Sequence, residues 1–248
     1  MLVNKSILTC FAVSMLLACG ILVSCASEEF IQPQSTASDN TTRELAPYFK
    51  RPTSAELPPD ANGFIQRWLL LEPIPQSIRS NRQLTDSFVQ GAIKKEYFPD
   101  QFIIVPKDGD KVSVGETEFI WHAVDASRYD VNLYSFARAL GKPTFNVLFW
   151  AVTIVDCPRD ISGVRLAVGS NSASIWWLNG KEVIDLYGDR HMLVDDGVSK
   201  RLALKKGKNV LRCAVINGPG LSDFCARFLD QEDKPLKSFN VSVSEKGK

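Results

Sequence analysis

The side chains most able to bind or transform a ligand gather in the polar segment 187–198. They are Tyr187, Arg190, His191, Asp195 and Asp196. An aromatic ring covers a sugar face, while guanidinium and carboxylate groups bind hydroxyls, so this combination suits a carbohydrate site. The two adjacent carboxylates also suit calcium, although the segment lacks the spacing of an EF-hand loop. We expect carbohydrate binding here, with calcium as the weaker alternative and no other cofactor.

Catalysis by a serine, histidine and aspartate triad needs a histidine beside the nucleophile. The chain has two histidines. His122 follows Trp121 in an apolar segment, which favours a structural role. This leaves His191 as the candidate base, with Ser222 beside a Gly/Pro-rich turn as a candidate nucleophile. No Gly-x-Ser-x-Gly motif occurs, so we expect no catalytic residue, and an esterase using His191 is the alternative.

The cysteines do not form a metal-binding pattern. Three of the six lie before residue 26, and the others are Cys157, Cys213 and Cys225. An odd number excludes complete pairing within the mature chain. Cys213 and Cys225 are either bridged across neighbouring strands or buried as small apolar side chains. Because no Cys-x-x-Cys or Cys/His spacing is present, we expect no zinc site.

The segment Gly163–Leu186 predicts three consecutive strands. Val164, Leu166 and Val168 alternate with Arg165 and Ala167, the period of a half-buried strand. Asn179-Gly180 then separates two apolar runs, which is the signal of a type I′ hairpin. We expect this hairpin to fix the direction of the strands around it.

The rest of the chain predicts more strands and one clear helix. Thr85–Phe98 has apolar residues at helical spacing, and Asn132–Leu140 fits helix or strand. Phe145–Val155 is almost continuously apolar, which is typical of a central strand covered on both faces. The remaining predicted strands are Phe64–Ile74, Phe102–Val105, Lys111–Val114, Phe119–Val124, Lys200–Leu204, Asn209–Ile216 and Phe224–Leu229. Short strands at this spacing predict an all-β sandwich or barrel with one or two short helices.

Alternating strand directions place three loops at one end of such a sandwich, namely Gly169–Ser174, Tyr187–Val198 and Asn217–Leu221. Binding residues concentrate on loops held by a rigid scaffold. Trp176 and Trp177 are consecutive on a strand and point to opposite faces, so both are packed or one forms an exposed platform. The expected ligand-binding residues are Asn171, Tyr187, Trp177, Arg190, Asp195, Asp196 and Asn217.

The N-terminus has the organisation of a secretory signal peptide. Lys5 precedes the apolar run Ile7–Val23, and Leu22-Val23-Ser24-Cys25 resembles a bacterial lipobox. Cys19 fits the same pattern, but cleavage there leaves an apolar stretch exposed. We expect residues 1–24 to be the signal peptide, Cys25 to be lipidated, residues 25–60 to form a flexible linker, and residues 61–248 to form the sandwich domain.

The charge balance argues against a nucleic-acid partner. The chain has 29 basic and 28 acidic residues, and cleavage removes Lys5, which leaves a net charge of zero. Nucleic-acid binding depends on clustered basic side chains that neutralise phosphates. We therefore expect no nucleic-acid partner and membrane attachment through the lipid alone.

Several motifs occur together in a recognisable order. They are Gly169–Asn171, Trp177–Lys181, Arg190, Leu204–Asn209, Phe224, Arg227, Phe228 and Asp230. Over about residues 145–240 the chain resembles the galactose-binding-like jelly-roll modules of bacterial glycoside hydrolases and of Bacteroidetes proteins labelled acetylxylan esterase. Those modules often carry Asp-Gly after the Gly-Ser, where this chain has Asn171-Ser172.

The resemblance implies a jelly-roll β-sandwich on a lipoprotein of the outer membrane or cell surface. It implies a non-catalytic carbohydrate-binding function in polysaccharide utilisation, with a carbohydrate or a glycoside hydrolase or esterase as partner. One alternative is a carbohydrate esterase of the acetylxylan esterase type. A second alternative is a structural lipoprotein that binds another protein.

Overall fold

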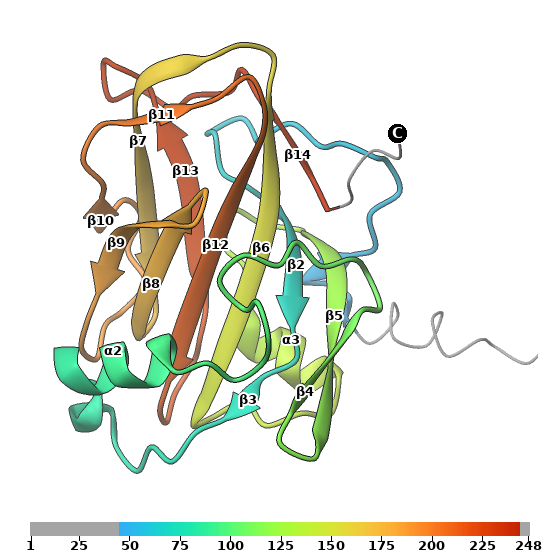
Figure 1. The fold of residues 1–248 in the computed structure, drawn as a ribbon, viewed down its shortest axis with the longest axis vertical. Helices are drawn as coiled ribbons and strands as arrows, with labels where there is room; N and C mark the ends of the chain where they lie inside the picture. The colour runs from blue at the N-terminus through green and yellow to red at the C-terminus, as the bar shows by residue number, and fades with distance from the viewer. Residues whose placement is uncertain (1–44, 244–248) are drawn as a thin grey trace, which may run out of the picture. The chain divides into compact units, whose positions relative to one another are not determined.

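The computed structural model describes residues 45–243, which form two antiparallel β-sheets that pack against each other, with short helices at their margins (Figure 1). The predicted signal peptide and lipidated Cys25 lie outside the described residues. Within residues 45–243, no helix combines the length and the apolar character needed to cross a membrane. The predicted all-β sandwich with two short α-helices is confirmed.

The larger sheet is built around β6. Its main path follows β1 (Phe49–Lys50), β5 (Thr117–Ala126), β2 (Arg67–Leu71), β6 (Val147–Cys157), β12 (Gly207–Asn217), β8 (Ala173–Leu178) and β9 (Lys181–Leu186). Two short strands, β3 (Ile74–Pro75) and β14 (Asn240–Ser242), also pair with β6, and β4 (Lys111–Val114) pairs with β5. β6 and β12 pair over their whole length, from Cys157 opposite Gly207 to Val147 opposite Asn217.

The smaller sheet is centred on β7 (Ile161–Ser170). β13 (Phe224–Leu229) pairs with β7, as do β10 (Gly197–Val198) and β11 (Leu202–Leu204). The three strands expected in Gly163–Leu186 therefore exist, but β7 and β8 belong to different sheets. The hairpin of β8 and β9 turns at Asn179 and Gly180, whose φ angles of 52° and 76° are those a type I′ turn requires.

β6 is covered on both faces, as its continuous apolar run predicted. Phe149 and Val155 pack into the core between the two sheets. Leu148 and Trp150 face the other way, into a second core. Helix α2 (Asp86–Lys94) closes that second core with Val89 and Ile93. The double burial explains why the alternation of a half-exposed strand is missing from this segment.

Each of the α-helices begins at a side-chain cap. Thr85 Oγ1 accepts a hydrogen bond from Phe88 N at 3.5 Å at the start of α2. Asn132 Oδ1 accepts one from Ser135 N at 2.7 Å, which starts α3 (Leu133–Ala139) and makes the ambiguous segment helical. The short 3-10 helix η1 (Asn81–Gln83) precedes α2.

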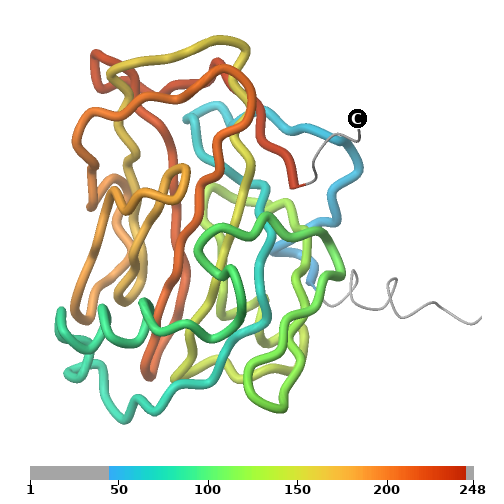
Figure 2. The backbone as a smooth tube through the Cα atoms, in the orientation of Figure 1, coloured from blue at the N-terminus to red at the C-terminus, as the bar shows by residue number. Residues whose placement is uncertain are grey.

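The predicted strand Phe102–Val105 is wrong. The segment belongs to an irregular connection that runs across the larger sheet after α2 (Figure 2). Phe102 packs against Trp150 and Trp177, with ring centroids 5.7 and 5.8 Å away. Arg212, only 2% exposed, donates to the main-chain carbonyls of Phe102 and Ile104. The apolar composition suggested a strand, but these main-chain carbonyls accept hydrogen bonds from a side chain and not from a neighbouring strand.

The folded part begins earlier than the predicted boundary at residue 61. Phe49 is 2% exposed, and β1 pairs with the end of β5. Leu57 exchanges main-chain hydrogen bonds with Val241 at 2.9 and 2.8 Å. The Pro-rich, polar composition of this segment suggested a linker, but two strands far away in the sequence hold it in place.

Candidate functional site

The three loops predicted to meet at one end of the sandwich do meet there. Ser172 N donates to the carbonyl of Arg190 at 3.2 Å, which joins the first loop to the second. Ser172 Oγ donates to Asn217 Oδ1 at 2.7 Å, which joins the first loop to the third. Asn171 N also donates to the carbonyl of Asp223 at 2.9 Å. We call these three connected loops the loop end.

Arg190, Asp195 and Asp196 of the loop end are all in ion pairs. Arg190 forms an ion pair with Asp196. Asp195 instead accepts from Arg227, whose Nε lies 2.9 Å from Asp195 Oδ1. Because the two neighbouring carboxylates engage different arginines, calcium binding by the pair would require both ion pairs to open. Among residues 45–243, no three His, Cys, Asp or Glu side chains are grouped for metal binding.

Asn217 and Tyr187 of the loop end are also occupied, whereas the side chains of Asn171 and His191 make no hydrogen bond to the described residues. Asn217 is 1% exposed and donates to the carbonyl of Gly220 at 3.1 Å. The hydroxyl of Tyr187 donates to Asp185 Oδ2 at 2.5 Å and accepts from Gln90. Burial, together with the Asp185 carboxylate, raises the pKa of Tyr187 to about 12. These groups hold the loops together, and a ligand would have to compete with those contacts.

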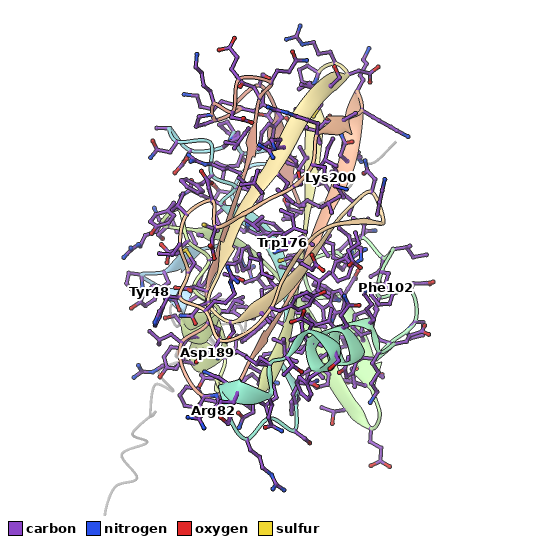
Figure 3. All side chains as sticks on the ribbon, turned by 90° about the vertical axis from the view of Figure 1, so that its left-hand side faces the viewer. Tyr48, Arg82, Phe102, Trp176, Asp189 and Lys200 are labelled. Atoms are coloured by element: carbon purple, nitrogen blue, oxygen red, sulfur yellow. The ribbon has the colours of Figure 1, made fainter. Side chains whose placement is uncertain are left out.

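Neither tryptophan of β8 offers a ring face to a sugar. Trp177 is 5% exposed and stacks on Trp150, with ring centroids 5.7 Å apart and an interplanar angle of 25°. Trp176 lies inside the sandwich (Figure 3). The expected role of Trp177 as a binding platform is therefore corrected, because both faces of β8 are covered by a core.

The contacts that the esterase alternative needs are not formed within residues 45–243. His191 is exposed, and its ring makes no hydrogen bond or ion pair to the described part of the chain. Ser222 is 1% exposed, and its Oγ has no hydrogen-bond partner there. The three described cysteines are free and buried, so Cys213 and Cys225 are not bridged. They lie in different sheets, opposite Ala151 and Gly169 respectively.

A pair of interacting carboxylates lies beneath the third loop. Val131 and Phe224 exchange main-chain hydrogen bonds at 2.7 and 3.2 Å, which brings Asp130 near Asp223. Burial, with a further contribution from the Asp130 charge, raises the pKa of Asp223 to about 6. Arg128 opposes this effect, and its Nε lies 3.0 Å from Asp130 Oδ1.

An open cleft of about 800 Å³ adjoins the loop end. Helix α3 forms one wall, and the N-terminal segment and the third loop complete it. Its lining residues are Ala46, Tyr48, Asn132, Tyr134, Ser135, Arg138, Ala139, Leu140, Gly141 and Leu221. Tyr134 N donates to the carbonyl of Ser222 at 3.0 Å, which fixes the helix to the loop. We call this feature the α3 cleft.

The periodicity of α3 turns its polar side chains toward the cleft. Leu133 and Phe136 are fully buried in the main core. Tyr134 and Arg138 are four residues apart, so they lie on one face of the helix, and Ser135 lies three residues before Arg138. The Tyr134 ring also contacts Phe145, with centroids 5.9 Å apart and an angle of 44°.

Four polar side chains of the α3 cleft have no hydrogen-bond or ion-pair partner among the described residues, unlike Arg190, Asp195, Asp196 and Asn217 of the loop end. Within residues 45–243, the hydroxyls of Tyr48, Tyr134 and Ser135 and the guanidinium of Arg138 make no hydrogen bond or ion pair. Sequence reasoning missed this site. The Tyr134/Arg138 spacing was a usable signal, because residues four apart share a face in a helix and in a strand. The segment fitted either element, and only a helix also brings Ser135 beside Arg138.

No protein-family model matches the sequence, and no curated protein matches it either. Among solved structures, the chain is similar to a PA14 sugar-binding domain from an RTX adhesin, with 11% identity, 72% of this chain and 99% of that chain covered, and a TM-score of 0.40. For the PA14 domain of the MpAFP antifreeze protein, the identity is 10%, the coverages are 70% and 89%, and the TM-score is 0.38.

A β-glucosidase from Kluyveromyces marxianus is also similar, with 20% identity and a TM-score of 0.34. That match covers 50% of this chain and 16% of the β-glucosidase. At TM-scores of 0.40 and below, these similarities do not identify a function, so the assignment of the site rests on its geometry.

Proposed function

We propose that the protein is a non-catalytic carbohydrate-binding module that takes its ligand in the α3 cleft. The observation that carries this proposal is the combination of an open cleft of about 800 Å³ with unengaged tyrosine, serine and arginine side chains. A sugar offers an apolar ring face and a rim of hydroxyls. The tyrosine rings suit the former, and the unpartnered donors and acceptors suit the latter.

We further propose that the module is a lipoprotein of the outer membrane or cell surface that acts in polysaccharide utilisation. The lipobox-like sequence ending at Cys25 supports the anchor. A module held at the surface would keep a polysaccharide close to a partner glycoside hydrolase or esterase, which raises the local substrate concentration.

Retention on insoluble glycans tests the proposed binding. The protein should be retained by at least one polysaccharide in a panel that includes xylan, and Tyr134→Ala should lower that retention at least tenfold. Leu193→Ala is the matched control, because Leu193 is 61% exposed but lies outside the cleft. Retention on no glycan, or equal loss in both variants, would contradict the proposal.

A protein-interaction function is the second candidate. Leu193, Val194 and Val198 are 61%, 44% and 39% exposed and lie close together in sequence within the second loop. Neighbouring exposed apolar side chains are typical of contact surfaces. In the retention assay this alternative predicts no binding to any glycan, which separates it from the leading proposal.

A further inference from the structure

We infer that the α3 cleft prefers glycans that carry carboxylates, such as chains of uronic acids. This inference rests on the proposed function and adds the chemical class of the ligand. Its basis is the charge of the cleft, in which Arg138 is the sole ionisable side chain besides the two tyrosines among the described lining residues. None of those described lining residues is an aspartate or glutamate that would neutralise the charge.

Two acidic residues near α3, Asp130 and Glu72, are already paired with other bases. Asp130 lies 3.0 Å from the Nε of Arg128. Glu72 lies 3.0 Å from Lys142 Nζ and 3.6 Å from His122 Nε2. Within residues 45–243, Arg138 forms no ion pair with either acid. Its guanidinium therefore has no anionic partner in the described part of the chain.

The groups around Arg138 are hydrogen-bond donors that suit a carboxylate ligand. Guanidinium binds a carboxylate through two parallel hydrogen bonds, and such charge-assisted bonds are about twice as strong as neutral ones. Ser135 and Tyr134 precede Arg138 by three and four residues, so their hydroxyls lie on the same helix face and add two further donors. The tyrosine ring remains free to cover the sugar to which the carboxylate belongs.

Calorimetric titration with oligogalacturonate and with its methyl ester tests the inference, because the ester keeps the sugar rings and removes the charge. The protein should bind the acid form at least tenfold more tightly than the ester. Arg138→Gln should remove that preference, so that the acid form and the ester bind with equal affinity. Arg159→Gln is the matched control, since Arg159 is an exposed arginine in the turn between β6 and β7.

The possible results separate the inference from the proposed function. Equal affinity for acid and ester, both weakened by Tyr134→Ala, would overturn the charge preference and leave carbohydrate binding supported. Equal weakening by Arg138→Gln and Arg159→Gln would also overturn it, because the attraction would then come from general charge. If the oligosaccharides fail to bind and the wider glycan panel also gives no retention, the proposed function fails with the inference.

Discussion

Replacing Asp223 by asparagine should change how the stability of this protein depends on pH. Asp223 Oδ1 is buried without a hydrogen-bond partner, and burial together with the Asp130 charge raises the pKa of Asp223 to about 6 from an ordinary 3.8. Between about pH 4 and pH 6, the folded state therefore keeps a proton that the unfolded state has released. The contribution of Asp223 to the free energy of unfolding must fall as the pH rises through this range and level off above it.

The size of the effect follows from the difference between those two pKa values. A difference between 3.8 and about 6 changes the free energy of unfolding by about 3 kcal/mol, at about 1.4 kcal/mol per unit of pKa. Because Asp223 is only partly buried, solvent screening should reduce this to about 1.5 kcal/mol. The asparagine variant does not titrate, so its stability relative to the wild type should rise by that amount between about pH 4 and pH 7.

Urea denaturation followed by tryptophan fluorescence at both pH values measures the effect. The same change at Asp100, an exposed residue with a φ of 59° that asparagine also tolerates, is the control. A relative change below about 0.5 kcal/mol for Asp223→Asn, within the usual error of comparing variants, would refute the reasoning. A change of opposite sign would show that Asp223 is stabilised in its charged form.

Three further substitutions test contacts elsewhere in the fold. Glu72→Gln should give the opposite pH trend. Burial raises the pKa of Glu72, but its hydrogen bonds with His122 and Lys142 outweigh burial and hold that pKa below the ordinary 4.5. Urea denaturation should therefore show the wild-type advantage shrinking as the pH falls below 4.5. Gly169→Ala should lower the free energy of unfolding, measured by thermal denaturation, by about 1–3 kcal/mol, because the added Cβ would lie 1.9 Å from the carbonyl oxygen of Leu193. Gly91→Ala is the control and should be neutral or stabilising, because a Cβ there would lie in open space on α2. Arg212→Met should leave the carbonyls of Phe102 and Ile104 without their hydrogen-bond donor. Hydrogen exchange of residues 99–106 should therefore become faster. Unchanged exchange would show that Arg212 does not anchor this segment.

Local sequence determined many of the elements because each depends on contacts close along the chain. The Asn179-Gly180 turn needs only positive φ at two residues, and Thr85 caps α2 within its own first turn. The continuous apolar run of β6 by itself predicted that both faces of this strand are buried.

The tertiary structure decided which polar groups remain available, because that depends on partners far away in the sequence. Asp195 is neutralised by Arg227, 32 residues later, and the carbonyl of Phe102 is bound by Arg212, 110 residues later. The loop end was therefore correctly located, but its side chains are largely occupied. Tyr134 and Arg138 share a face in a helix or a strand, but they line the α3 cleft only because the distant residues Ala46, Tyr48 and Leu221 complete its walls.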